Sequence, residues 1–181
     1  MKRMLARLFS SIIFTTTLTA AAAANERAEE NVRALVDEVQ RLHGPSLAEA
    51  IVADIDIGRT SRFVLGRHAI GLEERQLDEF KVRFQHFLLG LITSRAAEVE
   101  NAEIQILNSV DRGAHDCVVS TRVSTPTREP MTMRWRMIET DGNWRLVDVE
   151  VHGVWLAIEQ RAQIGSLLDR GSRISELYRE N

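Results

Sequence analysis

The spacing of hydrophobic residues changes halfway along the chain. In the first half, apolar residues recur every three or four positions, as between Val32 and Leu42, which is typical of amphipathic helices. The clearest helix is predicted over residues 73–100, where an apolar stripe that includes three phenylalanines lies opposite charged side chains. A shorter helix is expected through Ile51. Residues 25–100 are therefore predicted to be helical.

The second half alternates apolar and polar residues, which predicts β-strands. Four such segments, EIQILNSV, DCVVSTRV, MTMRWRMI and WRLVDVEV, lie within residues 103–153 and are joined by short links rich in turn residues. Short links favour an antiparallel meander. Helical periodicity returns in residues 157–180. This order predicts a single α+β domain, residues 25–181, in which N-terminal helices and a C-terminal helix pack on a curved four-stranded antiparallel sheet.

The pairing of the last two strands can be predicted residue by residue. A loop of Asp141, Gly142 and Asn143 sets apolar residues against apolar ones, whereas a loop one residue shorter would set them against charges. In the favoured register the charged side chains share one face of the sheet, and methionine, tryptophan and valine side chains share the other. The predicted pairs are Met133 with Val151, Arg134 with Glu150, Trp135 with Val149, Arg136 with Asp148, and Met137 with Val147.

The first 24 residues differ in character from the rest. Three basic residues precede an apolar run, residues 8–20, and four alanines follow at 21–24. This pattern indicates a secretory signal peptide, cleaved after Ala22 or Ala24. Removing residues 1–24 leaves 20 basic and 26 acidic residues, a net charge of −6, which argues against nucleic acid as a partner. We therefore expect an exported, soluble protein.

Three residues of the fourth strand could carry chemistry. Asp148, Glu150 and His152 alternate along it, so a strand would present all three on one face, as an acid–base or metal site requires. Cross-strand pairing with Arg134 and Arg136 offers a simpler use for the two acids. The sequence has no HExxH, paired-cysteine, GxSxG or glycine-rich phosphate-binding motif. No catalytic residue, metal site or cofactor is therefore predicted.

Two alternatives remain open at this level. An exported enzyme built on an NTF2-like cone of helices and curved sheet could use Asp148 or His152 as a general base. That hypothesis requires the base to point into the cavity, beside Trp135 and Met137. A ligand-free, protein-binding scaffold is the other alternative, and it would have a filled core.

A soft apolar face on the third strand suggests a binding function. Met131, Met133, Trp135 and Met137 alternate along it, and methionine adapts to varied shapes. If the phenylalanine stripe of residues 73–100 faces this strand, an apolar cavity would lie between sheet and helices. Ordinary core packing would give the same pattern. The predicted lining residues are Phe63, Phe80, Phe84, Phe87, Leu91, Met133, Trp135, Met137, Val149 and Val151.

Four segments along the chain resemble one protein family. They are DIDIGRTSRFVLGRH (54–68), EERQLDEFKVRFQHFLLGLI (73–92), RWRMIETDGNWRLVDVEVHGVWL (134–156) and EQRAQIGSLLDRG (159–171). In order and spacing they are similar to the motifs of the periplasmic phospholipid-binding proteins of the MlaC/toluene-tolerance family, including its hopanoid-associated branch. His152 stands where that family usually has a carboxylate.

The resemblance implies a function in lipid transport. Family members are periplasmic carriers that hold acyl chains between sheet and helices and maintain the lipid asymmetry of the outer membrane. They exchange phospholipid or another long apolar lipid with an inner-membrane ABC transporter that bears a substrate-binding ring, and with an outer-membrane lipoprotein complex. The resemblance thus implies a monomeric lipid-binding protein that is not an enzyme.

Overall fold

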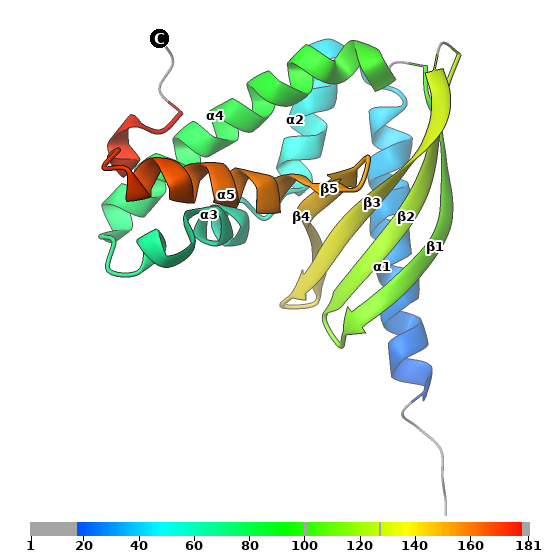
Figure 1. The fold of residues 1–181 in the computed structure, drawn as a ribbon. Helices are drawn as coiled ribbons and strands as arrows, with labels where there is room; N and C mark the ends of the chain where they lie inside the picture. The colour runs from blue at the N-terminus through cyan, green and yellow to red at the C-terminus, as the bar shows by residue number, and fades with distance from the viewer. Residues whose placement is uncertain (1–17, 100, 127, 179–181) are drawn as a thin grey trace, which may run out of the picture.

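The structure, a computed structural model, describes residues 18–99, 101–126 and 128–178 and has an α+β organisation (Figure 1). Its helices are α1 (Leu18–Val39), α2 (Gly44–Asp54), α3 (Ile57–Leu65), the 3-10 helix η1 (Gly66–Ala69), α4 (Glu74–Val99), α5 (Leu156–Asp169) and the 3-10 helix η2 (Ile174–Glu176). Its strands are β1 (Glu103–Gly113), β2 (Asp116–Thr125), β3 (Arg128–Thr140), β4 (Asn143–Val151) and β5 (Val154–Trp155).

The predicted signal peptide falls mainly outside the described residues. Residues 1–17 are not described, and residues 18–24 form the beginning of α1. Among the described helices, none combines the length and the apolar character that crossing a membrane requires.

Within the described residues the sheet has five strands, one more than the sequence predicts. Their order is β1-β2-β3-β4-β5 and each neighbouring pair is antiparallel, as expected for a meander. The additional strand, β5, has only two residues, too few for a periodic pattern. His152 and Gly153 make the turn before it, and both have positive φ, 52° and 81°. This is the backbone of a two-residue hairpin turn, which explains the place of an exposed histidine without any chemical role.

The β3–β4 register confirms four of the five predicted pairs and corrects the loop. Met133, Arg134, Trp135 and Arg136 face the partners predicted for them. The loop itself has two residues, Asp141 and Gly142, with φ of 52° and 79°. A bulge at Val147 compensates, so Met137 pairs with Leu146 instead of Val147. Hydrophobic pairing thus fixes the register of residues 133–136, far from the turn, whereas the conformation of the turn fixes the register of the pairs next to it.

The bulge of β4 also forms hydrogen bonds with residues at the start of α3. Thr60 of α3 donates its hydroxyl to the carbonyl oxygen of Val147 at 3.2 Å, and the Asp56 N–H donates to the carbonyl oxygen of Leu146 at 2.8 Å. The backbone of the bulged strand is therefore not left without partners. Residues 54–60, the first part of one of the family motifs, dock α3 against β4 in this way.

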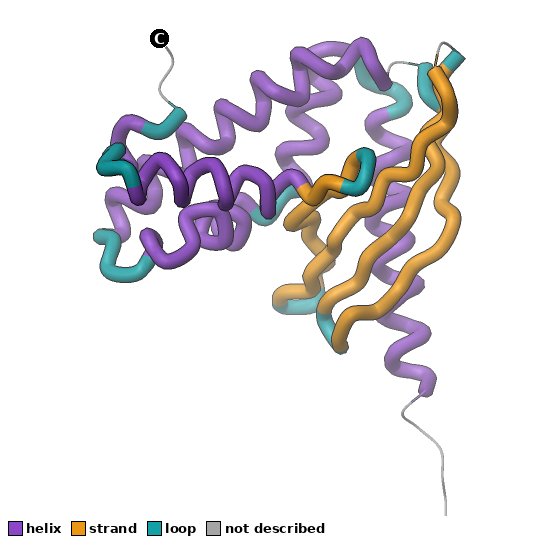
Figure 2. The backbone as a smooth tube through the Cα atoms, in the orientation of Figure 1, coloured by secondary structure: helices purple, strands orange, loops and turns teal. Residues whose placement is uncertain are grey.

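The hydrophobic core is divided into two clusters. In the first, α1 packs on the sheet and α2 packs on α1, with Trp135, Met137 and Leu146 among the buried residues. In the second, α3, α4, α5 and η2 pack on one another around Phe80 and Phe84. Figure 2 shows this second group of helices gathered beside the sheet and not over its face. The molecule therefore has a sheet-based half and an all-helical half.

The helical half is attached through the face of the sheet that carries the acids. Asp148 and Glu150 are each only 7% exposed, so the two acids of this face are buried and not open to solvent. Glu150 pairs with Arg134, whose guanidinium group lies 5.7 Å from the Trp155 ring centre. Asp148 does not pair directly with Arg136, because that arginine binds Asp116 through two hydrogen bonds of 3.1 and 2.8 Å.

Asp148 instead holds the first turn of α5. Its Oδ1 accepts hydrogen bonds from the backbone N–H groups of Ala157 and Val149, both at 2.8 Å. The first N–H groups of a helix have no hydrogen-bond partner within the helix. A carboxylate at this position therefore caps α5 and interacts favourably with the positive end of the helix dipole. Burial raises the pKa of Asp148 above its usual value, and the two N–H groups oppose that rise.

We predict that replacing this carboxylate destabilises the attachment of α5. Asp148→Ala should lower the free energy of unfolding by about 1–2 kcal/mol, the usual cost of losing a helix cap. Asp148→Asn should cost less, because its amide oxygen can accept the same N–H groups. Urea denaturation followed by circular dichroism would measure both losses, and equal losses would contradict a role for the oxygen acceptor.

The raised pKa makes a separate prediction about pH. Because the folded protein holds the Asp148 proton to a higher pH than the unfolded chain does, the contribution of this group to the free energy of unfolding falls as pH rises from about 4 through the folded pKa. Asp148→Asn should flatten this part of the stability profile. Denaturation midpoints measured between pH 4 and 7 for both proteins would test it; parallel profiles would refute it.

Candidate functional site

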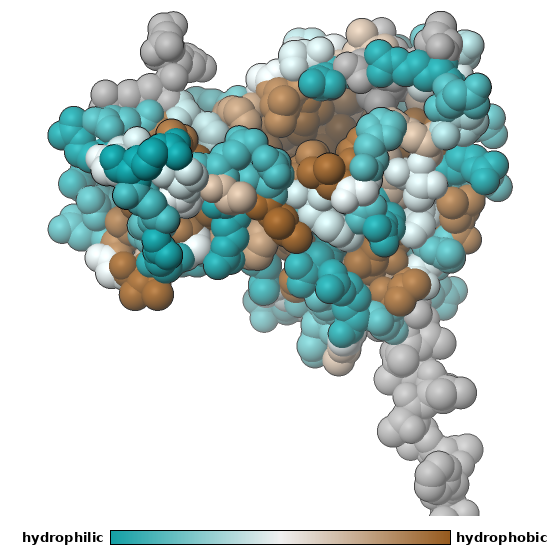
Figure 3. Space-filling view, in the orientation of Figure 1, coloured by the Kyte–Doolittle hydropathy of each residue, from teal (hydrophilic) through white to brown (hydrophobic). Residues whose placement is uncertain are grey.

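An apolar hollow opens on the surface between the two halves. In the space-filling view, hydrophobic surface forms its floor between α4 above and β5 below (Figure 3). Its position coincides with the division between the two hydrophobic clusters, which α2 and α4 bridge by packing on each other. This hollow is the candidate functional site.

The predicted lining residues on the sheet fall into two classes according to how deeply they are buried. Trp135 and Met137 are buried in the first cluster, and the Trp135 Nε1–H donates to Thr121 Oγ1 at 2.9 Å. Met133 and Val149 are only partly buried and pack on the edge of that cluster, and Val151 is also partly buried. Side chains at the edge of a core can move to admit a ligand more readily than fully packed ones.

The helices contribute the remaining predicted residues, and all of these except Leu91 belong to the second cluster or pack against it. Phe80 and Phe84 are buried, Phe87 and Phe63 are partly buried, and Leu91 is 37% exposed. The phenylalanine stripe of α4 therefore packs mainly on α3 and η2, while α2 supports another side of the helix. The hydrophobic core therefore does not form through the predicted contact between this stripe and the methionine face of β3.

The aromatic residue that the sequence prediction missed is Tyr178. Its ring lies 4.3 Å from that of Phe87 and within 6 Å of the rings of Phe80 and Phe84, at 5.8 and 5.6 Å. Its hydroxyl donates to Gln160 Oε1 at 2.7 Å, and burial raises its pKa. A lone tyrosine near the end of the chain, beyond the last clear helical pattern, gives no periodic signal. The phenylalanine stripe thus obtains its partner from the C-terminus.

The polar residues that might have supported catalysis lie elsewhere. Asp148 belongs to the face of the sheet opposite Trp135 and Met137, and His152 is exposed in its turn. The condition set for the enzyme hypothesis, a base beside Trp135 and Met137, is therefore not met. In the part of the chain that the structure describes, no group of three or more histidine, cysteine or acidic side chains could hold a metal ion.

Two of the family motifs are joined by one cluster of charges. Arg67 and His68, at the end of the segment 54–68, both bind Asp169 at the end of α5, the histidine through Nε2 at 3.0 Å. Arg67 is the main reason that the pKa of Asp169 lies below its usual value. Nearby, the guanidinium group of Arg161 lies 5.0 Å from the Phe63 ring centre. These contacts hold α3 and α5 together and so form one wall of the helical half.

A solved structure has the same fold. The phospholipid-binding protein from Ralstonia solanacearum, determined in complex with a phospholipid at 1.53 Å, superposes with a TM-score of 0.71. The match covers 86% of this chain and 92% of that protein, at 18% sequence identity. No curated protein matches the sequence.

The sequence as a whole matches one family. The model of the family described as "MlaC protein" aligns with residues 15–180, which include all four motif segments and every described helix and strand. The match thus covers both the sheet-based and the all-helical half. The chain belongs to the MlaC family.

Proposed function

We propose that this protein is a periplasmic carrier that binds phospholipid, or a similar long apolar lipid, and shuttles it between complexes of the inner and outer membranes. The observation that carries this proposal is the apolar hollow at the division of the hydrophobic core (Figure 3). Family membership supports lipid binding, and the Ralstonia solanacearum protein of the same fold contains a bound phospholipid.

Lipid energetics explain why a lipid needs a carrier with an apolar shelter to cross an aqueous space. Burial of a methylene group is worth about 0.8 kcal/mol, so two acyl chains of about 30 methylenes gain roughly 24 kcal/mol by leaving water. A lipid therefore does not cross an aqueous space at a useful rate without an equally apolar shelter. Two clusters that are each well packed can separate to admit acyl chains without exposing either interior.

Transfer into and out of such a shelter is close to energetic balance. The sequence has no glycine-rich nucleotide-binding motif, so the proposal places any energy source in a partner. We infer an inner-membrane ABC transporter with a substrate-binding ring as one partner and an outer-membrane lipoprotein complex as the other. The proposal includes cleavage of a signal peptide near residue 24 and a monomeric mature domain, residues 25–181.

The placement of the predicted lining residues refines their proposed roles. Apolar side chains that are not fully buried are the better candidates for contact with acyl chains, and fully buried ones maintain the two clusters. The proposed contact residues are Phe63, Phe87, Leu91, Met133, Val149 and Val151. Phe80, Phe84, Trp135 and Met137 would form the supporting walls.

We expect lipid to accompany the purified protein. Native mass spectrometry of protein prepared without detergent should show a lipid-bound species, and extraction of that species should yield phospholipid or hopanoid. Protein stripped of lipid should regain it from phospholipid vesicles. A protein that is empty on purification and also takes up no lipid from vesicles would contradict the proposal.

Two methionines of β3 provide a matched test of the lining. Met133 and Met137 point to the same face, but Met133 is partly buried whereas Met137 is 0% exposed. Met133→Gln should reduce lipid loading several-fold with a small change in stability. Met137→Gln should lower the free energy of unfolding by about 1–3 kcal/mol, because it buries an amide among apolar side chains.

The two variants would be compared by lipid uptake from vesicles and by urea denaturation. Equal effects of both variants on loading, after correction for the unfolded fraction, would assign Met133 to ordinary core.

A further inference from the structure

A row of three side chains crosses the last three strands on the face of the sheet that carries the acids. Arg134 of β3 lies opposite Glu150 of β4, and Glu150 lies opposite Trp155 of β5. Arg134 donates from Nε to Glu150 Oε1 at 2.9 Å and from Nη2 to both oxygens of that carboxylate. Its guanidinium group also lies over the Trp155 ring. One arginine of β3 therefore connects all three strands.

A second row crosses the same strands on the opposite face. Met133 lies opposite Val151, and Val151 lies opposite Val154. Because neighbouring positions of a strand point to opposite faces, these apolar side chains lie directly behind the row of Arg134. Met133 and Val151 are among the proposed lipid contacts. Val154, which is 46% exposed, extends this apolar row onto β5.

The backbone of β5 contributes little to holding the strand in place. The strand has two residues, and two residue pairs join it to β4. So short a strand forms few ladder hydrogen bonds, and isolated hairpins are marginally stable in water. The residues before it, His152 and Gly153, form an exposed turn. The position of β5 therefore depends on side-chain contacts such as that of Trp155 with Arg134.

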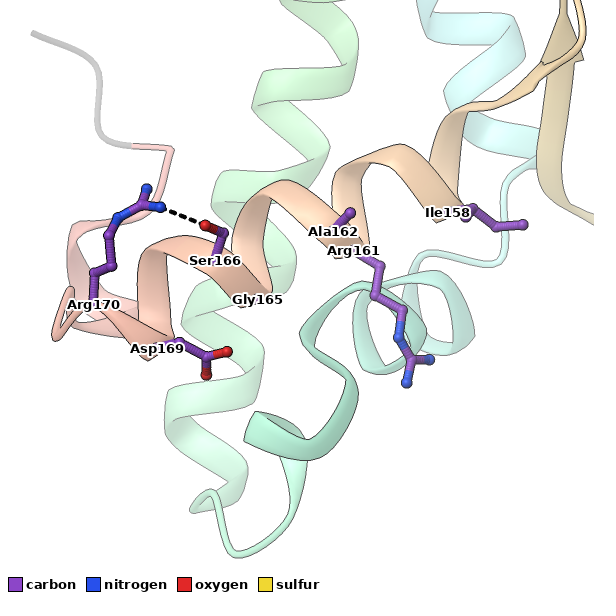
Figure 4. A pocket seen from close by; sticks show the side chains of 7 residues that line it. All are labelled: Ile158, Arg161, Ala162, Gly165, Ser166, Asp169 and Arg170. Carbon is purple, nitrogen blue, oxygen red and sulfur yellow. Dashed lines mark hydrogen bonds between the residues drawn. The ribbon is translucent and has the colours of Figure 1, made fainter.

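The turn and β5, residues 152–155, border the apolar hollow, and we call them the β5 lip. In the space-filling view the hollow lies between α4 and β5 (Figure 3). Beyond Val154 the chain continues with two more exposed apolar residues, Leu156 and Ile158, in the first turn of α5. Figure 4 shows Ile158 at the sheet end of that helix, with the rest of its outer side leading away from the sheet.

The start of α5 is fixed separately from the β5 lip. Asp148 accepts the Ala157 N–H, two residues after β5 ends, and so holds the helix to β4. The β5 lip is thus a short segment between two fixed points, the end of β4 and the first turn of α5. Its own position is left to the two ladder pairs and to Arg134.

The burial of Glu150 points to a positioning role for its ion pair. The Glu150 side chain is 9% exposed, and a buried carboxylate is costly unless it is paired. Buried ion pairs often add little net stability compared with apolar side chains of similar size. What this pair does provide is a fixed orientation of the Arg134 guanidinium group, which then lies over Trp155.

We propose that Arg134 is a positioning residue for the lipid site. By binding Glu150 and Trp155 on one face of the sheet, it holds the β5 lip at the hollow on the other face and so slows the release of bound lipid. Arginine suits this role because its planar guanidinium group can bind a carboxylate through its edge and an aromatic ring through its face. The inference rests on the proposed carrier function and adds what controls release.

Arg136 provides a matched control for Arg134. It lies two residues further along β3 on the same face, and it likewise binds an acid through Nε and Nη2, in this case Asp116. Asp116 belongs to β2, on the side of β3 away from β5. Arg134→Gln and Arg136→Gln therefore each remove one ion pair from the same strand, but only Arg134→Gln frees the β5 lip.

Lipid release would be measured by loading each protein with fluorescent phosphatidylethanolamine and following its transfer to an excess of phosphatidylcholine vesicles. Arg134→Gln should release the lipid about fivefold faster, the factor expected from the loss of one cation–π contact. Arg136→Gln should release it at the wild-type rate. Arg134→Lys, which keeps the charge but not the paired hydrogen bonds, should give an intermediate rate.

Trp155→Leu tests the same contact from the other side. It leaves the ion pair of Arg134 with Glu150 in place, so it keeps the test open if Arg134→Gln fails to fold. It should accelerate release as Arg134→Gln does. Combining the two substitutions should add little more, because both remove one and the same contact.

Hydrogen exchange of backbone amides gives a readout that needs no lipid. The amides of residues 152–155 should exchange several-fold faster in Arg134→Gln and in Trp155→Leu than in the wild-type protein. Those of residues 158–168 in α5 should keep their protection, because Asp148 still holds the start of the helix. Equal acceleration along the whole chain would show a general loss of stability and would contradict the proposal.

The release rates decide between a positioning residue and an ordinary structural ion pair. Equal rates for Arg134→Gln and Arg136→Gln would overturn the proposal, and so would unchanged release in Trp155→Leu. Normal lipid uptake with unchanged release would contradict this proposal alone. A wild-type protein that takes up no lipid would contradict the carrier function and, with it, the control of release.

Discussion

The buried carboxylate of Asp148 determines where the two halves of the molecule meet. By accepting the Ala157 N–H, it fixes the start of α5 at the edge of the sheet. The end of α5 is in turn bound to η1, which directly follows α3, through the contacts of Asp169 with Arg67 and His68. A carboxylate that is 7% exposed is costly to bury, and two N–H donors and the nearby Arg136 offset that cost.

This attachment has a consequence for packing. Because the helical half is attached at the edge of the sheet, its phenylalanines pack on one another and on Tyr178 instead of covering the methionine face of β3. Two separate clusters result, with partly buried apolar side chains packed against each. A protein with a single continuous core could admit a lipid only by disrupting its packing, whereas a divided core offers an existing boundary.

The β3–β4 hairpin shows how far reasoning from sequence can reach. The pairs from Met133 to Arg136 could be predicted because a one-residue slip would set every apolar residue against a charge. The two-residue turn and the compensating bulge at Val147 could not. Two- and three-residue hairpin loops are both common, and Thr60, whose hydroxyl donates to the carbonyl oxygen of Val147, comes from a distant segment. The positive φ of His152 could not be predicted either, because β5, the strand that follows its turn, is too short to give a periodic pattern.

By itself, the sequence determined the order of helices and strands, the faces of each strand and the family motifs, because these follow from periodicity and local spacing. Only the tertiary structure decided which apolar faces meet. Both α4 and β3 carry an apolar stripe, and the hydrophobic effect has no direction, so neither pattern identifies the surface on which it packs. Specific polar contacts determine which apolar faces meet: Asp148 with the start of α5 and Thr60 with the bulge of β4. They turned one predicted core into two, and so created the hollow between them.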